Sequence, residues 1–128
     1  MKKRQGFGRV IRAFFNSMDG IQAAWKHEAA FRQELVLGTL LLVSIPFLPI
    51  NTVESILLVM SVLIVLVTEL LNSGLEWTID YISKAQHPYA KRVKDMGSAA
   101  VFFALVLMGL TWFCVLWNCF GSSEVIGL

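Results

Sequence analysis

The stretch SILLVMSVLIVLVTELL, residues 55–71, decides the class of fold, because residues 56–67 are apolar except for Ser61. A helix that crosses the hydrocarbon core of a bilayer needs about 20 mostly apolar residues. The helix that begins here must therefore continue past Glu69 and into the sequence NSGLEWTID, residues 72–80. The stretch predicts a membrane-spanning helix that carries an acidic side chain inside the membrane.

Two other apolar segments flank this one, LVLGTLLLVSIPFLPI at 35–50 and SAAVFFALVLMGLTWFCVLWNCF at 98–120. Hydrophobic residues make up 56% of the 128 residues and charged residues only 16%, whereas soluble domains are about one quarter charged. We therefore expect an all-α membrane protein that forms a single domain over residues 1–128. Its transmembrane helices are predicted at about 33–50, 54–80 and 95–120.

The connection between the first two segments also carries signals. Pro46 and Pro49 are expected to loosen or end the first helix, because proline lacks a backbone N–H group. The residues NTVES that follow predict a tight turn, in which Asn51 or Thr52 can cap the second helix.

Residues 7–34 follow a different pattern, in which apolar side chains recur every three or four residues with polar side chains between them. A basic amphipathic helix of this kind lies in the membrane interface rather than across it. We expect such an interfacial helix over about residues 6–32. Gly20 is its candidate break point, because glycine is a poor helix former.

The lysines and arginines alternate between the two sides of the predicted membrane. The first interhelical loop and the residues after Phe120 contain none. Basic residues gather on cytoplasmic loops, so the N-terminus and the second loop are predicted to be cytoplasmic and the C-terminus periplasmic. Seven basic residues precede Leu35 and four lie in the second loop: Lys2, Lys3, Arg4, Arg9, Arg12, Lys26 and Arg32, then Lys84, Lys91, Arg92 and Lys94.

The polar residues at the end of the second segment share one face of a helix, within about a third of its circumference at about 100° per residue. An unpaired acid at the depth of Glu69 costs about 3 kcal/mol, so we expect Glu69 to be functional. Asp80 lies nearer to water and can be either an interfacial anchor or a participant. The stripe consists of Glu69, Asn72, Ser73, Glu76 and Asp80.

Other charged residues are predicted at the same membrane surface. Glu28 and Arg32 are four apart on one face of a helix, and Lys94 and Asp95 open the third span. Carboxylates such as Glu28 and Glu76 suit Mg²⁺, which prefers oxygen ligands and substrate phosphates. Lys94 and Arg9 can neutralise phosphate charge.

Known nucleotide-binding and nucleic-acid-binding signatures do not explain these residues. The sequence has neither the GxxxxGK[ST] loop nor the glycine-rich loop of soluble kinases. It carries no recognisable nucleic-acid module, and its basic residues suit anionic lipid equally well. We therefore expect membrane lipid, and not nucleic acid, as a partner.

Three motifs carry a specific resemblance. EAAFRQE (28–34), ELLNSGLE (69–76) with Asp80 following, and KDMGSAAV (94–101) resemble the integral-membrane diacylglycerol kinase family of Gram-negative bacteria. The resemblance extends from about Gly6 to Phe120. Gly74 and Ile79 depart from the usual family residues, and the tail after Gly121 has no evident match.

The resemblance implies ATP-dependent phosphorylation of diacylglycerol to phosphatidic acid in the bacterial inner membrane, with Mg²⁺ as cofactor. It also implies a homotrimer with active sites shared between subunits. Three helices are in any case too few to enclose both substrates, so we expect an oligomeric bundle.

The resemblance also assigns roles to individual residues. Glu69 matches the general base and Asn72 a residue that supports it. Glu28 and Glu76 match the metal ligands. The implied ATP contacts are Arg9, Asn16, Glu28, Glu76, Lys94 and Asp95, and the implied lipid-substrate contacts are Arg9, Ala30, Phe31, Glu34, Ser98 and Trp112.

Three alternatives remain open on the sequence. An undecaprenol kinase would use the same chemical residues and differ only in its lipid groove. A small proton-coupled exporter would use Glu69 to bind and release protons, but it has no need for the set formed by Glu28, Glu76 and Lys94. In a non-catalytic assembly or lipid-binding protein, the polar stripe would serve only to pack the oligomer.

Overall fold

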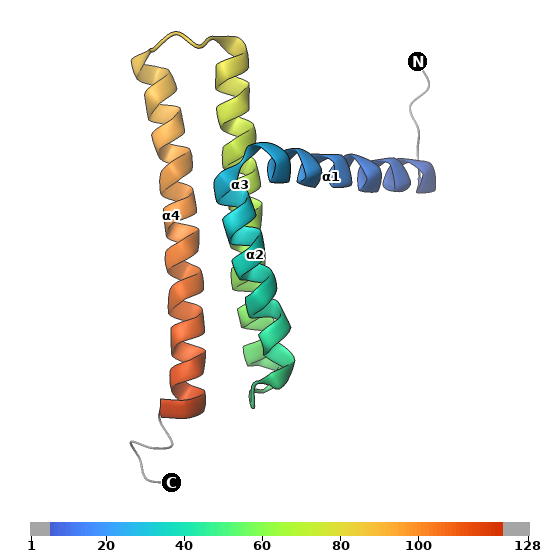
Figure 1. The fold of residues 1–128 in the computed structure, drawn as a ribbon, viewed down its shortest axis with the longest axis vertical. Coiled ribbons are helices and arrows are strands. Elements are labelled where there is room, and N and C mark those ends of the chain that lie inside the picture. The colour runs from blue at the N-terminus through green and yellow to red at the C-terminus, as the bar shows by residue number, and fades with distance from the viewer. Residues whose placement is uncertain (1–5, 122–128) are drawn as a thin grey trace.

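A computed structural model of the chain describes residues 6–121. Every regular element among these residues is a helix, which confirms the predicted all-α class (Figure 1). The four main helices are α1 (Phe7–His27), α2 (Ala29–Ser44), α3 (Thr52–Ile82) and α4 (Pro88–Leu116). A short 3₁₀ turn, Ile45–Phe47, follows α2, and a π-helical turn, Trp117–Gly121, follows α4.

Helix α1 projects sideways from the other three helices, which run alongside one another (Figure 1). Its apolar side chains are exposed, including Phe7 at 80%, Phe14 at 58% and Phe15 at 61% of their surface. An amphipathic helix that lies crosswise to the spans and exposes its apolar side chains is suited to the membrane interface. The predicted break at Gly20 is wrong, because α1 continues through this residue to His27.

The chain instead bends at Glu28, whose backbone is extended with φ −119° and ψ 105°. The guanidinium group of Arg32 stabilises the bend by donating from Nη1 to the backbone oxygen atoms of Trp25, at 2.7 Å, and Lys26, at 3.3 Å. These carbonyl groups belong to the last turn of α1, where helix carbonyls lack partners within the helix. Glu28 is therefore the N-cap of α2, four residues before Arg32, whose backbone N–H group donates to its carbonyl oxygen. Helix α2 begins four residues before the predicted start of the first span.

The connection between α2 and α3 has the predicted cap and helix end, but the predicted turn over NTVES is wrong, because residues 52–55 already belong to α3. Helix α2 ends at Ser44, and Pro46 lies in the 3₁₀ turn that follows. Asn51 caps α3 by accepting a hydrogen bond at Oδ1 from the backbone N–H group of Glu54, at 2.8 Å. Glu54 accepts one in return from the backbone N–H group of Asn51, at 3.2 Å, which completes a capping box.

Helix α4 begins at Pro88, so the connection after α3 is shorter than predicted. His87 caps α4 by accepting from the backbone N–H group of Tyr89 at Nδ1, at 3.1 Å. Proline is favoured at the first position of a helix because its missing N–H group has no partner there. Lys91, Arg92 and Lys94, which were predicted to lie in a loop, are thus on the first turns of a helix.

Helix α3 packs against both α2 and α4. Its core contacts with α4 are formed by Leu58, Val62, Trp112 and Val115. Three helical segments are each long and apolar enough to cross a membrane: Ala29–Phe47, Thr52–Ile82 and Pro88–Gly121. Most of their apolar side chains point outward, which indicates a multi-pass membrane protein.

The predictions for Lys2, Lys3, Arg4 and the tail after Gly121 lie outside the described residues.

Candidate active site

The polar stripe of α3 becomes more exposed toward the end of the helix. Glu69 and Ser73 are buried, with 5% and 6% of their surface exposed. Asn72 and Glu76 are half-buried, and Asp80 is exposed. The predicted order of the three acids, with Glu69 the most sheltered, is therefore seen in the packing of a single chain.

The length of α3 places the same three acids at different depths in a membrane. Its 31 residues extend about 46 Å at 1.5 Å per residue, whereas the hydrocarbon core of a bilayer is about 30 Å thick. If the capped end at Asn51 lies at one boundary, the opposite boundary is reached near Leu71. Glu69 then lies just inside the apolar region, and Glu76 and Asp80 lie beyond it.

Four carboxyl groups from three parts of the chain converge at this level. The side chain of Glu34, on α2, lies beside that of Glu69, and its buried Oε2 atom has no hydrogen-bond partner among the described residues. Glu76, on α3, and Glu28, at the bend, are close enough to Glu69 for their charges to act on it. The sequence placed Glu28, Glu69 and Glu76 at one membrane surface, and the fold adds Glu34 to them.

Glu28 and Glu76 each use one carboxylate oxygen in a hydrogen bond. Oε1 of Glu28 accepts from the indole N–H group of Trp77 at 2.6 Å, and Oε1 of Glu76 accepts from the amide group of Asn72 at 3.3 Å. Among residues 6–121, no three histidine, cysteine or acidic side chains are gathered closely enough to hold a metal ion by themselves. Mg²⁺ needs only one or two protein carboxylates when phosphates and water complete its shell, and the carboxylate oxygens of Glu28 and Glu76 are of the type that this ion prefers.

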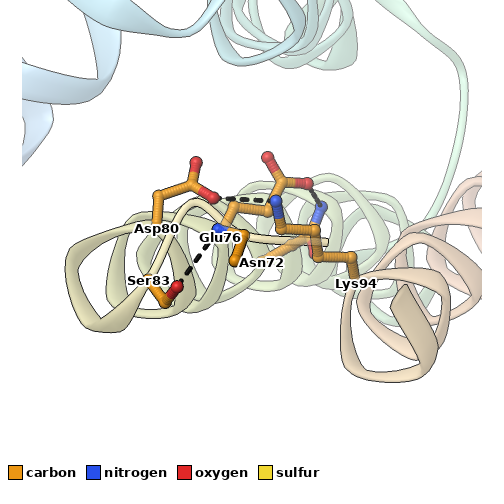
Figure 2. A network of polar contacts seen from close by, with 6 residues as sticks. Asn72, Glu76, Asp80, Ser83 and Lys94 are labelled. Atoms are coloured by element: carbon orange, nitrogen blue, oxygen red, sulfur yellow. Dashed lines mark hydrogen bonds and ion pairs between the residues drawn. The ribbon is translucent and has the colours of Figure 1, made fainter. Parts of the chain in front are cut away.

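Two lysines of α4 form ion pairs beside the outer end of the stripe. Lys94 Nζ lies 2.8 Å from Oδ1 of Asp80, and Lys91 Nζ lies 2.6 Å from Oδ2 of Asp95. Figure 2 shows Asn72, Glu76 and Asp80 along α3, with Lys94 reaching across from α4. Lys94 is thus placed next to the carboxylates, as a phosphate-binding cation would need to be.

Two cavities border this region. One, of about 750 Å³, lies where α3 meets α4 and is lined by Asp80, Lys94 and Asp95 together with the connecting residues 83–87. The other, of about 690 Å³, lies between α1 and α3. Most of its lining is apolar or small: Ser17, Gly20, Ile21, Ala23, Ala24, His27, Glu28, Leu70, Ser73, Gly74 and Trp77.

Some predicted site residues are not brought together in a single chain. Arg9 and Asn16 are exposed on α1, and Arg9 lies about 28 Å along the helix from the bend at Glu28, at 1.5 Å per residue. Trp112 is buried among core residues three helical turns deeper than Glu69, where it packs with Leu58 and Val62. Of the other predicted lipid contacts, Ala30 and Ser98 are exposed and Phe31 is buried.

The structure also identifies residues whose importance was not predicted. The indole N–H group of Trp77 donates to Glu28, a contact across the fold that the sequence did not indicate. Gly97 lies so close to Asn72 that a methyl group there would collide with Oδ1 of the asparagine. That oxygen is buried and has no hydrogen-bond donor among the described residues. The only sequence signal for Gly97 was its place in the motif KDMGSAAV.

Comparisons with known proteins agree with these features. The family described as prokaryotic diacylglycerol kinase matches residues 15–116. The chain is 43% identical over 116 residues to the diacylglycerol kinase of Escherichia coli strain K12, an alignment that covers 91% of this chain and 95% of the relative. It is 40% identical over 112 residues to the enzyme of Haemophilus influenzae, covering 88% and 95%. The enzyme of Pseudomonas aeruginosa is 40% identical over 115 residues, covering 90% and 94%.

Proposed function

This chain belongs to the prokaryotic diacylglycerol kinase family, and we propose that it transfers the γ-phosphoryl group of ATP to the free hydroxyl group of diacylglycerol. The products are phosphatidic acid and ADP. The observation that carries this proposal is the position of Glu69, a buried acid at the end of an apolar span, with carboxylates on its water-facing side. A lipid hydroxyl group lies at this depth, and ATP approaches from water.

Glu69 acts as the general base, with Asn72 as its neighbour on the same face. It takes the proton from the lipid hydroxyl group while the oxygen forms a bond to the γ-phosphorus atom and the bond to the bridging oxygen of ADP breaks. The contribution of the protein is chiefly position and charge, which is what phosphoryl transfer requires.

Glu28 and Glu76 hold a magnesium ion, whose charge offsets that of the phosphate groups. Their carboxylate oxygens match its ligand preference, and both are near Glu69 without sharing its burial. Glu28→Gln and Glu76→Gln are each expected to raise the Mg²⁺ concentration that gives half-maximal activity. An unchanged Mg²⁺ dependence in both variants would argue against ligation.

Lys94 and Asp95 serve the nucleotide. They line the cavity of about 750 Å³ at the meeting of α3 and α4, next to the outer end of the carboxylate cluster. The lysine ammonium group supplies positive charge for the phosphates. The apolar cavity between α1 and α3 supports a lipid-binding role for the apolar face of α1.

Arg9 and Asn16 reach the nucleotide of a neighbouring subunit in a homotrimer. Helix α1 carries both residues away from the carboxylate cluster of its own chain (Figure 1). Mixing a Glu69→Gln subunit with an Arg9→Ala subunit should restore activity if one active site takes residues from two chains. Mixed trimers that stay inactive would favour a site within one chain.

Glu69→Gln tests the base directly. This change keeps the size of the side chain and removes its ability to take a proton, so turnover should fall by about a thousandfold or more. Glu54→Gln at the other end of α3 is the matched control, because glutamine also serves in a capping box. Near-normal activity of the purified Glu69→Gln protein would rule out this role.

The lipid acceptor and the orientation can be tested separately. Purified protein in mixed micelles with labelled ATP should phosphorylate diacylglycerol in preference to undecaprenol, and the opposite preference would identify a polyprenol kinase.

The protein is proposed to lie in the bacterial inner membrane with its N-terminus in the cytoplasm and its C-terminus in the periplasm, as the basic residues indicate. Reporter fusions at each end would report both locations.

A further inference from the structure

The side chain of Trp77 joins α3 to the bend between α1 and α2. Its indole N–H group donates to Oε1 of Glu28 at 2.6 Å, across 49 positions of sequence. The ring also contacts His27 edge-on, with 5.5 Å between the ring centroids and 65° between the planes. Trp77 thus contacts the last residue of α1 and the bend residue that follows it.

The environment of Glu28 makes this bond important for its orientation. Glu28 lies at the junction of two helices, where its backbone N–H group donates to Ala24 and its carbonyl group accepts from Arg32, so the side chain is the part of the residue that a further contact can orient. Among the described residues, the Trp77 indole is the only hydrogen-bond donor to the Glu28 carboxylate. An indole group can only donate a hydrogen bond, so the bond has one possible direction, from Trp77 to the carboxylate of Glu28.

We propose that Trp77 is a positioning residue that holds Oε1 of Glu28 and thereby directs the other carboxylate oxygen toward the divalent cation. This inference rests on the proposed role of Glu28 as a metal ligand. Carboxylates that bind metals are themselves oriented by hydrogen bonds, and loss of such a partner weakens metal affinity by about 10- to 100-fold. The other nearby partner of the metal, Glu76, is oriented in the same manner by Asn72 at 3.3 Å.

A different role for Trp77 must be separated from this one. Tryptophan is common at membrane interfaces, where its ring is an anchor, and Trp77 is 56% exposed. An anchor depends on the shape and polarity of the ring, whereas a positioning residue depends on the N–H group. Replacing Trp77 with 3-benzothienylalanine keeps the shape of the ring and substitutes sulfur for the N–H group, so it distinguishes the two.

The first measurement is the affinity for Mn²⁺, a paramagnetic substitute for Mg²⁺, in the presence of a non-hydrolysable ATP analogue. Electron paramagnetic resonance should show affinity about tenfold weaker in both the Trp77→Phe and the benzothienylalanine proteins. Trp117→Phe, in the turn after α4, is the matched control and should bind as the wild type does. The Mg²⁺ concentration for half-maximal activity should rise in parallel, while kcat at saturating Mg²⁺ changes less than about twofold.

The second measurement observes the hydrogen bond itself. In ¹H–¹⁵N spectra of the detergent-solubilised protein, the indole resonance that Trp77→Phe removes should move upfield in Glu28→Gln, because a neutral amide is a weaker acceptor than a carboxylate. A resonance that does not respond to Glu28→Gln would overturn the proposed contact. Wild-type Mn²⁺ affinity in the benzothienylalanine protein would also overturn the proposal and leave Trp77 as an anchor.

Glu28→Gln separates this inference from the proposed function. If Glu28→Gln weakens Mn²⁺ binding and the two Trp77 substitutions do not, Glu28 is a ligand and the positioning role alone fails. If Glu28→Gln leaves Mn²⁺ affinity unchanged, the metal assignment fails and the positioning role fails with it. In a Glu28→Gln background, Trp77→Phe should cause no additional loss of affinity.

Discussion

Asn72 fits against α4 because residue 97 is glycine: a methyl group on Gly97 would collide with Oδ1 of Asn72 and would approach Cδ2 of Leu75 to 3.3 Å. Asn72 in turn donates to Glu76. The position of the polar stripe relative to α4 therefore depends on the lack of a side chain at Gly97.

Gly97→Ala is expected to lower activity at least tenfold by displacing Asn72 from Glu76. Overpacking of this kind costs about 1–3 kcal/mol, and the better helix propensity of alanine recovers about 1 kcal/mol, so the free energy of unfolding should fall by no more than about 2 kcal/mol. Gly109→Ala is the control, since nothing lies within 4 Å of the added methyl group. Activity assays and thermal unfolding would check both, and a fully active Gly97→Ala protein would contradict this close packing.

Lys94 is expected to exchange its partner Asp80 for the nucleotide. The ion pair is partly exposed, with 40% and 48% of the two side chains accessible, so its contribution to stability should be below about 1 kcal/mol. Asp80→Asn should leave the unfolding temperature nearly unchanged and lower the KM for ATP by about two- to threefold, because a competing anion is removed. Lys94→Met should reduce kcat/KM by about a thousandfold or more.

Arg92→Met is the control for this pair of changes. Arg92 is exposed on the same part of α4 and does not line the cavity that Lys94 and Asp95 share, so neutralising it should alter kcat/KM by less than about threefold. Steady-state kinetics against ATP concentration would measure all three variants. A higher KM for ATP in Asp80→Asn would show that the aspartate positions Lys94 rather than competing for it.

Hydropathy and helical periodicity were sufficient to predict the spans, the polar stripe and the graded burial of its acids. These properties depend on the solvent around a helix and on the spacing of residues along it. The cap at Asn51 and the helix end before Pro46 were also predictable, because both are local. Such features need no knowledge of what lies across the fold.

The bend at Glu28 and the role of Trp77 depend on contacts between distant residues. The residues from Trp25 to Arg32 are compatible with a continuous helix, and the bend is stabilised when Arg32 reaches back to two carbonyl groups. Trp77 is on the apolar face by its place in the sequence, and only the crosswise path of α1 brings Glu28 to it. Helical periodicity carries no information about such a change of direction.

Arg32→Met is therefore expected to loosen the bend. It leaves the carbonyl groups of Trp25 and Lys26 without their donor, which should cost about 1–2 kcal/mol, and it retains much of the apolar stem. Limited proteolysis should then cleave near residues 25–28 faster than in the wild type. Arg12→Met, an exposed position on α1, should leave this cleavage rate unchanged. Equal rates in all three proteins would mean that Arg32 does not stabilise the bend.

The contact between α2 and α3 depends on Gly38. A methyl group there would come within 2.8 Å of Cγ1 of Val62, a side chain that is 1% exposed in the α3–α4 core. Gly38→Ala should therefore lower the free energy of unfolding by about 1–3 kcal/mol, as measured by thermal or denaturant unfolding in detergent. Because the collision is with one side chain, Val62→Ala should rescue it: the double variant should be more stable than the sum of the two single effects. Strict additivity would place the strain elsewhere in the bundle.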